Sequence, residues 1–279
     1  MTYRYRVDLN SVTEFAPASA TAWRDGDAWL GGGTWLFSQP QPAVRRLLDL
    51  AAFGWAPLEE TTDGLRVAAT CTLAELGRWR PAHPSAAPAA TLARQCCDAL
   101  LGSFKVHNAA TVGGNICLSL PAGPMTALAA SLDAAVRLAA PDGGTREMPV
   151  TDFVTGDGRN ALRAGELLRD VFIPAASLTA RTAFRQVSLS PVGRSAVLVI
   201  ARRQAGAPGR PGETVVTITA ATPRPVQLRF PAPPSPAEAV AALAQRRDLA
   251  YLDDVHGAAA WRRAMTGRLV GEVLAELRR

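Results

Sequence analysis

The sequence predicts an α+β fold that ends in an antiparallel sheet with helices beside it. Three strand-like runs follow one another in the last third of the chain, and two helical runs come after them (182–187, 196–201 and 214–220, then 237–245 and 257–277). Strands and helices segregated in this way are typical of α+β folds. With 279 residues, 48% of them hydrophobic, the chain is long enough for two or three subdomains. We place them at residues 1–56, 57–174 and 175–279.

The first subdomain is expected to open with a strand and a helix. Residues 3–8 alternate in polarity as a strand does, and Ser11 with Glu14 forms the capping-box pattern that starts a helix. A short apolar strand at 28–30 then leads into a run of glycines, and another strand is expected at 44–50. This order predicts a small β-α-β unit with glycine at its turn.

The middle subdomain is predicted to mix strands and helices. Thr72 with Glu75 is a second capping box, and Ala89 to Leu101 has apolar residues at helical spacing. The remaining expected elements are a strand at 65–69, a buried helix at 125–133, a strand at 134–139 that turns into a hairpin, and a polar loop at 153–160.

Two glycine-rich stretches, each with a threonine, are the candidate ligand site. Gly31-Gly32-Gly33-Thr34 follows the strand at 28–30, and Thr111-Val112-Gly113-Gly114-Asn115 follows an apolar run. Glycine lets a ligand lie against the main chain, and successive N–H groups form a concave nest that suits phosphate. Alone, the pair of glycines beside Asn115 is more often an ordinary tight turn. Together, the two stretches suggest one diphosphate held from both sides.

The composition argues against several other kinds of protein. A net charge of +6 and a pI near 9.8 are compatible with nucleic-acid binding, but Lys105 is the only lysine and the arginines are scattered. The four cysteines form no C-x-x-C pair, so buried free thiols are favoured over a metal or cluster site. We find no Ser-His-Asp or paired-carboxylate pattern, and we assign no catalytic residue.

The chain contains no apolar run of the ~20 residues that a membrane-spanning helix needs. Its first residues, Met1 to Arg6, lack the apolar centre of a secretory signal. We therefore expect a cytoplasmic protein.

The two glycine motifs and their order resemble the FAD-binding medium subunit of the molybdenum hydroxylases, which include xanthine dehydrogenases, carbon monoxide dehydrogenases and aldehyde oxidoreductases. The resemblance is carried by Gly31-Gly32-Gly33-Thr34-x-Leu36 and by Asn108-x-Ala110-Thr111-Val112-Gly113-Gly114-Asn115-Ile116, and extends to Asp253–Gly257. It implies the two-subdomain FAD-binding fold of PCMH/VAO type. It also implies that the flavin performs the redox chemistry while the protein holds and tunes it.

The resemblance implies a set of FAD-binding residues, mostly acting through main-chain amides. Leu168 takes the place of a leucine that touches the flavin, and Leu101 that of a residue near it. On this basis, replacing Gly32 or Gly113 with a branched residue is expected to leave a folded chain without FAD. The full set is Gly31, Gly32, Gly33, Thr34, Trp35, Leu36, Leu101, Ala110, Thr111, Gly113, Gly114, Asn115, Leu168 and Arg185.

Three positions depart from the pattern of the family. Pro124 stands where the family has an aspartate near the cofactor, Arg185 replaces a lysine, and Trp35 replaces an aspartate. Arginine keeps the charge but donates through a planar fork. The loss of the carboxylate at Pro124 is expected to weaken FAD binding.

The resemblance implies a subunit that passes electrons from a [2Fe–2S] partner to NAD⁺, oxygen or another acceptor. The partners would be a molybdopterin-binding large subunit and a [2Fe–2S] small subunit, in a dimer of heterotrimers. A stand-alone flavin oxidase or reductase with the same fold is the first alternative. A non-enzymatic protein that binds anions or nucleic acid is the second.

Overall fold

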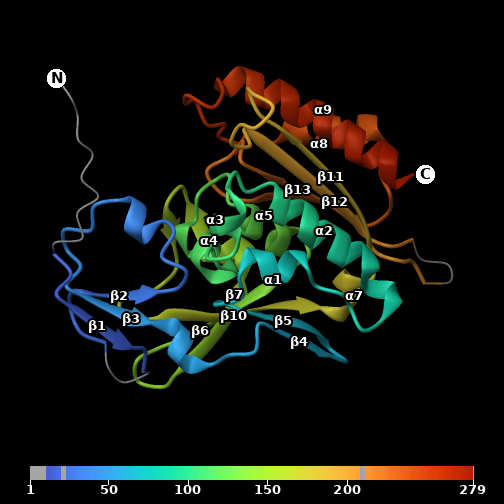
Figure 1. Ribbon diagram of the computed structural model, residues 1–279. Coiled ribbons are helices and arrows are strands. Elements are labelled where there is room, and N and C mark those ends of the chain that lie inside the picture. The colour runs from blue at the N-terminus through green and yellow to red at the C-terminus, as the bar shows by residue number, and fades with distance from the viewer. Residues whose placement is uncertain (1–10, 20–22, 208–210, 279) are drawn as a thin grey trace, which may run out of the picture.

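The computed structural model describes residues 11–19, 23–207 and 211–278, and it contains three main sheets (Figure 1). The middle and C-terminal sheets lie on opposite sides of a layer of helices, and two further helices cover the outer face of the C-terminal sheet (Figure 1). This architecture confirms the predicted α+β class. The strand expected at residues 3–8 lies outside the described residues.

The first sheet is parallel and has the order β1-β3-β2. Its strands are β1 (Glu14–Pro17), β2 (Asp27–Leu30) and β3 (Arg46–Asp49), with the short 3₁₀ helices η1 (Leu36–Ser38) and η2 (Leu50–Phe53) after β2 and β3. The helix predicted to begin at Ser11 is wrong, because this stretch forms β1. The amides of Thr13 and Glu14 donate to the carbonyl of Arg45, so pairing with β3 overrides the capping pattern.

The second sheet is antiparallel, with the order β4-β5-β10-β6-β7. Its long central strand, β10, comes last in the sequence. The helices between β5 and β6 therefore precede in sequence the strand that joins these two strands in the sheet. The strands are β4 (Leu58–Thr61), β5 (Gly64–Ala68), β6 (Ala135–Ala139), β7 (Thr145–Pro149) and β10 (Leu167–Pro174). The loop expected at 153–160 instead forms a small hairpin of β8 (Val154–Gly156) and β9 (Arg159–Asn160).

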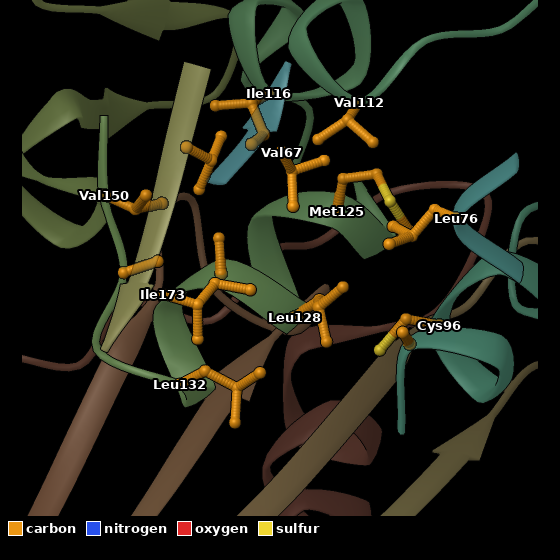
Figure 2. Packing of buried hydrophobic residues seen from close by; sticks show 14 of the residues in the cluster. Val67, Leu76, Cys96, Val112, Ile116, Met125, Leu128, Leu132, Val150 and Ile173 are labelled. Atoms are coloured by element: carbon orange, nitrogen blue, oxygen red, sulfur yellow. The ribbon is translucent and has the colours of Figure 1, made fainter. Parts of the chain in front are cut away.

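The helices between the two sheets enclose the main hydrophobic core. Every residue of α5 is buried, and Figure 2 shows its Met125 and Leu128, with Leu132 just after its end, among side chains from the neighbouring helices and strands. The predicted capping box of Thr72 and Glu75 is confirmed at the start of α1. The elements of this region are α1 (Leu73–Gly77), η3 (Pro84–Ala86), α2 (Ala87–Asp98), α3 (Phe104–His107), α4 (Val112–Leu118), α5 (Pro124–Ser131), α6 (Val150–Phe153) and α7 (Ala175–Leu178).

The third sheet is antiparallel, with the order β11-β12-β13-β14. The three strands predicted here are confirmed, and β14 was not predicted. One face contacts α2 and α5, and the other packs on α9 (Figure 1). The elements are β11 (Arg181–Val187), β12 (Val197–Arg203), β13 (Thr214–Thr219), β14 (Val226–Phe230), α8 (Pro236–Gln245) and α9 (Ala259–Leu277).

Candidate FAD-binding cleft

A cleft of about 670 Å³ opens between the end of β2, the layer of helices and the loop that joins β11 to β12. Its walls come from the glycine loop after β2, the end of α2, the first turns of α4, the turn before α5 and the loop between β11 and β12. This volume lies within the roughly 300–1,000 Å³ that small-molecule sites occupy. The cleft is lined by Trp29, Leu30, Gly31, Gly32, Gly33, Thr34, Trp35, Leu36, Gln41, Ala99, Leu100, Leu101, Val106, Ala110, Thr111, Gly114, Asn115, Cys117, Leu118, Leu120, Ala122, Gly123, Arg194 and Ser195.

The first glycine loop presents unbonded amides to this cleft. Among the described residues, no protein acceptor is found for the backbone N–H groups from Gly31 to Trp35. Gly33 has φ +70°, and this left-handed conformation turns the chain between β2 and η1. A run of free N–H groups around a turn is a ready anion site.

An ion pair fixes the base of the first loop. Arg46 of β3 donates to both carboxylate oxygens of Asp27 in β2, at 2.8 and 2.6 Å. The hydrogen bond from Arg46 lowers the pKa of the Asp27 carboxyl below its ordinary value, although burial opposes this shift. The carboxylate therefore stays ionised at neutral pH and joins the two strands.

The second glycine motif is the start of a helix, not a loop as predicted. Thr111 is the N-cap of α4, and its Oγ1 accepts from the amide of Gly114 at 3.1 Å. The amides of Val112 and Gly113 donate to the carbonyls of Cys71 and Ala69. Most of the motif's N–H groups are thus already bonded within the protein, and Gly113 and Gly114 have no positive φ.

Some donors of the second motif remain available. No protein acceptor is found in the described residues for the amide or the hydroxyl hydrogen of Thr111. The Oδ1 of Asn115 accepts from the amide of Met125 at 3.0 Å, which leaves its Nδ2 as a donor. The motif therefore meets a ligand with side chains more than with amides.

Close packing explains three of the glycines: Gly31 and Gly32 lie against the second motif and the residues before it, and Gly113 lies against Ala69. A Cβ at Gly32 would overlap the carbonyl oxygen of Ala109, and one at Gly31 would lie 3.0 Å from the Oγ1 of Thr111. A Cβ at Gly113 would lie 2.5 Å from that of Ala69. The loss of FAD that is expected from a branched residue at Gly32 or Gly113 would therefore not require that this residue fill the space of the ligand. Such a side chain would meet protein atoms.

Eleven of the predicted residues line the cleft, which brings the two motifs together as expected. Trp35 and Leu101 stand at its rim and are exposed. The eleven are Gly31, Gly32, Gly33, Thr34, Trp35, Leu36, Leu101, Ala110, Thr111, Gly114 and Asn115.

Three predicted residues do not line this cleft. Gly113 packs on Ala69, and Leu168 is 3% exposed in the main core on β10. Arg185 forms ion pairs with Glu272 at 3.4 Å and Glu276 at 2.7 Å on α9.

The position of Arg185 follows from the alternation of side chains along β11. Phe184 packs against the main core, so the next residue points to the opposite face, which α9 covers. Two glutamates on that helix then satisfy its charge.

Pro124 is buried and does not line the cleft. It is the first residue of α5, where the missing N–H of proline costs little. A carboxylate at this position would be buried. The expectation that FAD binds more weakly because the chain has proline here stays a prediction.

Arg194 and Ser195 are lining residues that the sequence did not indicate, as are Gln41 and Leu118. Arg194 and Ser195 lie between two strands of the third sheet, far in sequence from either glycine motif. Their position in the cleft depends on tertiary packing, and no local pattern marks it.

The cysteines behave as buried thiols. Cys71, Cys96 and Cys97 are buried, and the partly exposed Cys117 is one of the residues that line the cleft. Loss of hydration raises the pKa of Cys71, Cys97 and Cys117 to about 12. No group of three metal-binding side chains is found within the described residues.

Across the same residues, no helix is long and apolar enough to cross a membrane.

The cleft suits an extended dinucleotide with a central diphosphate. Free amides of the first loop meet anionic oxygens, and the hydroxyl of Thr111 and Nδ2 of Asn115 add donors from the other wall. Apolar side chains such as Trp29, Leu36 and Leu100 offer surfaces for flat rings. The residues present therefore fit FAD.

Comparison with known proteins agrees with this geometry. The family model described as the FAD binding domain in molybdopterin dehydrogenase matches residues 8–176. The FAD subunit of nicotinate dehydrogenase from Eubacterium barkeri is 37% identical over 91 residues, 32% of this chain and 30% of that protein. Xanthine dehydrogenase 1 from Arabidopsis thaliana is 28% identical over 130 residues, 42% of this chain and 9% of that protein. These curated relatives are thus matched over less than a third of their length.

Solved structures show the same fold over nearly the whole chain. The reconstituted CO dehydrogenase from Oligotropha carboxidovorans matches with a TM-score of 0.79 and 22% identity, over 95% of this chain and 96% of that one. Quinoline 2-oxidoreductase from Pseudomonas putida 86 matches with a TM-score of 0.77 and 20% identity, over the same shares. Because the family model spans more than half of the 279 residues, the chain belongs to the family of FAD-binding domains of molybdopterin dehydrogenases.

Proposed function

We propose that this chain is the FAD-carrying electron-transfer subunit of a molybdenum hydroxylase complex. The observation that carries the proposal is the run of free amides in the first loop, within a cleft that belongs to a domain of this family. The bound flavin would supply redox chemistry between a [2Fe–2S] partner and NAD⁺, oxygen or another acceptor. The chain itself binds and orients the cofactor.

The two motifs would hold FAD in different ways. The amides from Gly31 to Trp35 would bind the diphosphate, and the side chains of Thr111 and Asn115 would bind it from the α4 side. Trp35 and Leu101, at the rim, would limit the access of water to the bound cofactor. No covalent attachment is proposed.

The partners would be a molybdopterin-binding large subunit and a [2Fe–2S] small subunit, in a cytoplasmic dimer of heterotrimers. The nicotinate dehydrogenase relative is an FAD subunit, which supports a role for this chain within a larger enzyme. The structural likeness to CO dehydrogenase supports the same arrangement at the level of the fold.

Purification of the chain tests the cofactor. We expect a yellow protein with flavin absorption near ~450 nm, and acid precipitation should release the flavin into the supernatant. A colourless protein that does not take up added FAD would contradict the proposal.

Co-expression with the neighbouring reading frames tests the complex. Molybdenum and iron that elute with the tagged chain would support the subunit role. A flavoprotein that elutes alone and turns over a substrate without partners would favour the stand-alone oxidase or reductase.

A further inference from the structure

We propose that Arg194 supplies the positive charge that balances the diphosphate of FAD, an inference that rests on the proposed function. Among the described residues that line the cleft, Arg194 is the only one with a formal charge at neutral pH. The diphosphate of FAD carries about two negative charges, whereas amides contribute only partial charges. Without Arg194, the cleft would receive this anion with no cation of its own.

Arg194 is free to take this role. Its side chain is half-buried and has no ion pair or hydrogen bond with any part of the chain that the structure describes. Arg185, the basic residue that the family pattern indicates, is instead held by two glutamates of α9. The third sheet thus offers the cleft a different arginine from the predicted one.

The loop that carries Arg194 is held at both ends. The amide of Ala196 donates to the carbonyl of Val187 at 2.9 Å, and the Oγ of Ser195 donates to the Oε1 of Gln186 at 3.0 Å. These bonds join the two ends of the loop between β11 and β12. The backbone next to Arg194 is therefore held in place.

A buried arginine holds the end of this loop that leads into β12. Arg262 of α9 is 1% exposed and donates to the carbonyls of Ala196 at 2.7 Å and Ala220 at 2.6 Å. It also pairs with Asp254. The C-terminal helix therefore positions the wall of the cleft that faces the glycine motifs.

Arginine suits this position for two reasons. Its planar guanidinium can donate two parallel hydrogen bonds to phosphate oxygens, and it stays charged at any pH the protein meets. Partial burial in the cleft reduces screening by water and salt. Because Arg194 lies in the loop between β11 and β12, it would also connect the third sheet to a cofactor bound by the two glycine motifs.

The test measures ligand affinity of the protein freed of FAD, with FAD, ADP and riboflavin as three separate probes. We expect Arg194→Gln to weaken FAD and ADP to a similar extent, about tenfold or more, because each loses a charge-assisted hydrogen bond. Riboflavin, which has no phosphate, should bind as before. Arg194→Lys should recover part of the loss, and FAD binding by Arg194→Gln should depend less on salt.

Arg181→Gln is the matched control. Arg181 lies on β11, is exposed, lacks an ion pair within the described ranges, and does not line the cleft. Its removal changes the net charge equally and should leave all three affinities unchanged. Circular dichroism and thermal unfolding establish that each variant is folded.

Three results would overturn the inference while leaving the proposed function intact. These are an unchanged FAD affinity in folded Arg194→Gln, an equal loss of riboflavin binding, or an equal effect of Arg181→Gln. Failure of the unaltered protein to bind FAD would instead overturn the proposed function, and the role of Arg194 with it.

Discussion

The two glycine motifs look alike in sequence but do different work in the structure. The first, Gly31-Gly32-Gly33, is a true loop whose amides have no acceptor in the described parts of the chain. The second, Gly113-Gly114, is the first turn of α4, and its amides are bonded to Ala69 and Thr111. One motif offers the backbone to a ligand, and the other uses it to join α4 to the rest of the protein.

The difference shows that adjacent glycines do not by themselves mark a phosphate loop. At Gly33, glycine is needed for a positive φ. At Gly113, it is needed because α4 passes against the backbone of Ala69. The same substitution should therefore have different consequences in the two motifs.

The largest expected effect is the loss of FAD from Gly32→Ala. The new methyl group would overlap the carbonyl of Ala109 and force the first loop away from α4. The loop is at the surface and can move, so the fold should survive. Loss of two hydrogen bonds to the diphosphate, at ~1.5 kcal/mol each, would weaken FAD about a hundredfold in a fluorescence titration. Retention of full affinity would show that the first loop does not hold the diphosphate.

The next effect is a loss of stability in Gly113→Ala. Here the methyl group would meet Cα and Cβ of Ala69 at 2.8 and 2.5 Å, in a buried position that cannot yield easily. Overpacking of this kind costs ~1–3 kcal/mol, so the FAD-free protein should melt several degrees lower. The control is Gly271→Ala in α9, where no atom lies within 4 Å of the new Cβ and stability should rise slightly. Equal melting temperatures for both variants would contradict the packing role.

Much of the fold could be predicted because its signals are local. The capping box at Thr72, the apolar spacing of α2 and the alanine-rich, largely apolar α5 depend on neighbours within a few residues. The stretch from Ser11 misled because its capping pattern competes with parallel pairing to β3, whose residues lie some thirty positions away. A pattern of neighbouring residues carries no information on the pairing of β1 with β3.

The sequence motifs indicated part of the lining of the cleft, and tertiary packing decides the rest. Arg185 was expected to reach FAD, but the alternation along β11 turns it toward α9. Arg194, which does line the cleft, has no motif around it. A sequence can indicate that a basic residue is near, whereas the face of a strand and the path of a loop decide which one.

A smaller effect separates the two functions of Asn115. Its Oδ1 holds the amide of Met125, and its Nδ2 is available to a ligand. Asn115→Asp keeps the acceptor and replaces the donor with a negative charge, so α5 should stay in place while FAD binds about tenfold more weakly, the value of ~1.4 kcal/mol. Asn115→Leu should lose both stability and affinity. If Asn115→Asp instead binds FAD as tightly as the unaltered protein, the ligand role of this side chain fails.

The smallest expected effect is a selective response of the first loop to acid. Its base is the ion pair of Asp27 and Arg46, in which the hydrogen bond from Arg46 lowers the pKa of the carboxyl despite burial. A carboxyl with a lowered folded-state pKa stabilises the protein above its ordinary value of 3.8. That stabilisation is lost as the pH falls through the folded-state pKa. The bonds that hold the second motif join neutral groups, so they do not titrate in this range.

This difference can be measured as the pH dependence of FAD affinity between pH 7 and pH 3. The unaltered protein should bind constantly down to about pH 4 and then weaken, by no more than about fivefold if the pair contributes ~1 kcal/mol. Asp27→Asn, which keeps the shape but not the charge, should start from the weaker affinity and lose this step. Glu14, which pairs with Arg24 and lies near Arg46, is present in both proteins, so only the difference between the two curves reports on Asp27. Parallel curves would mean that the base of the first loop is held by the pairing of β2 with β3, and that the charge of Asp27 adds nothing to the cleft.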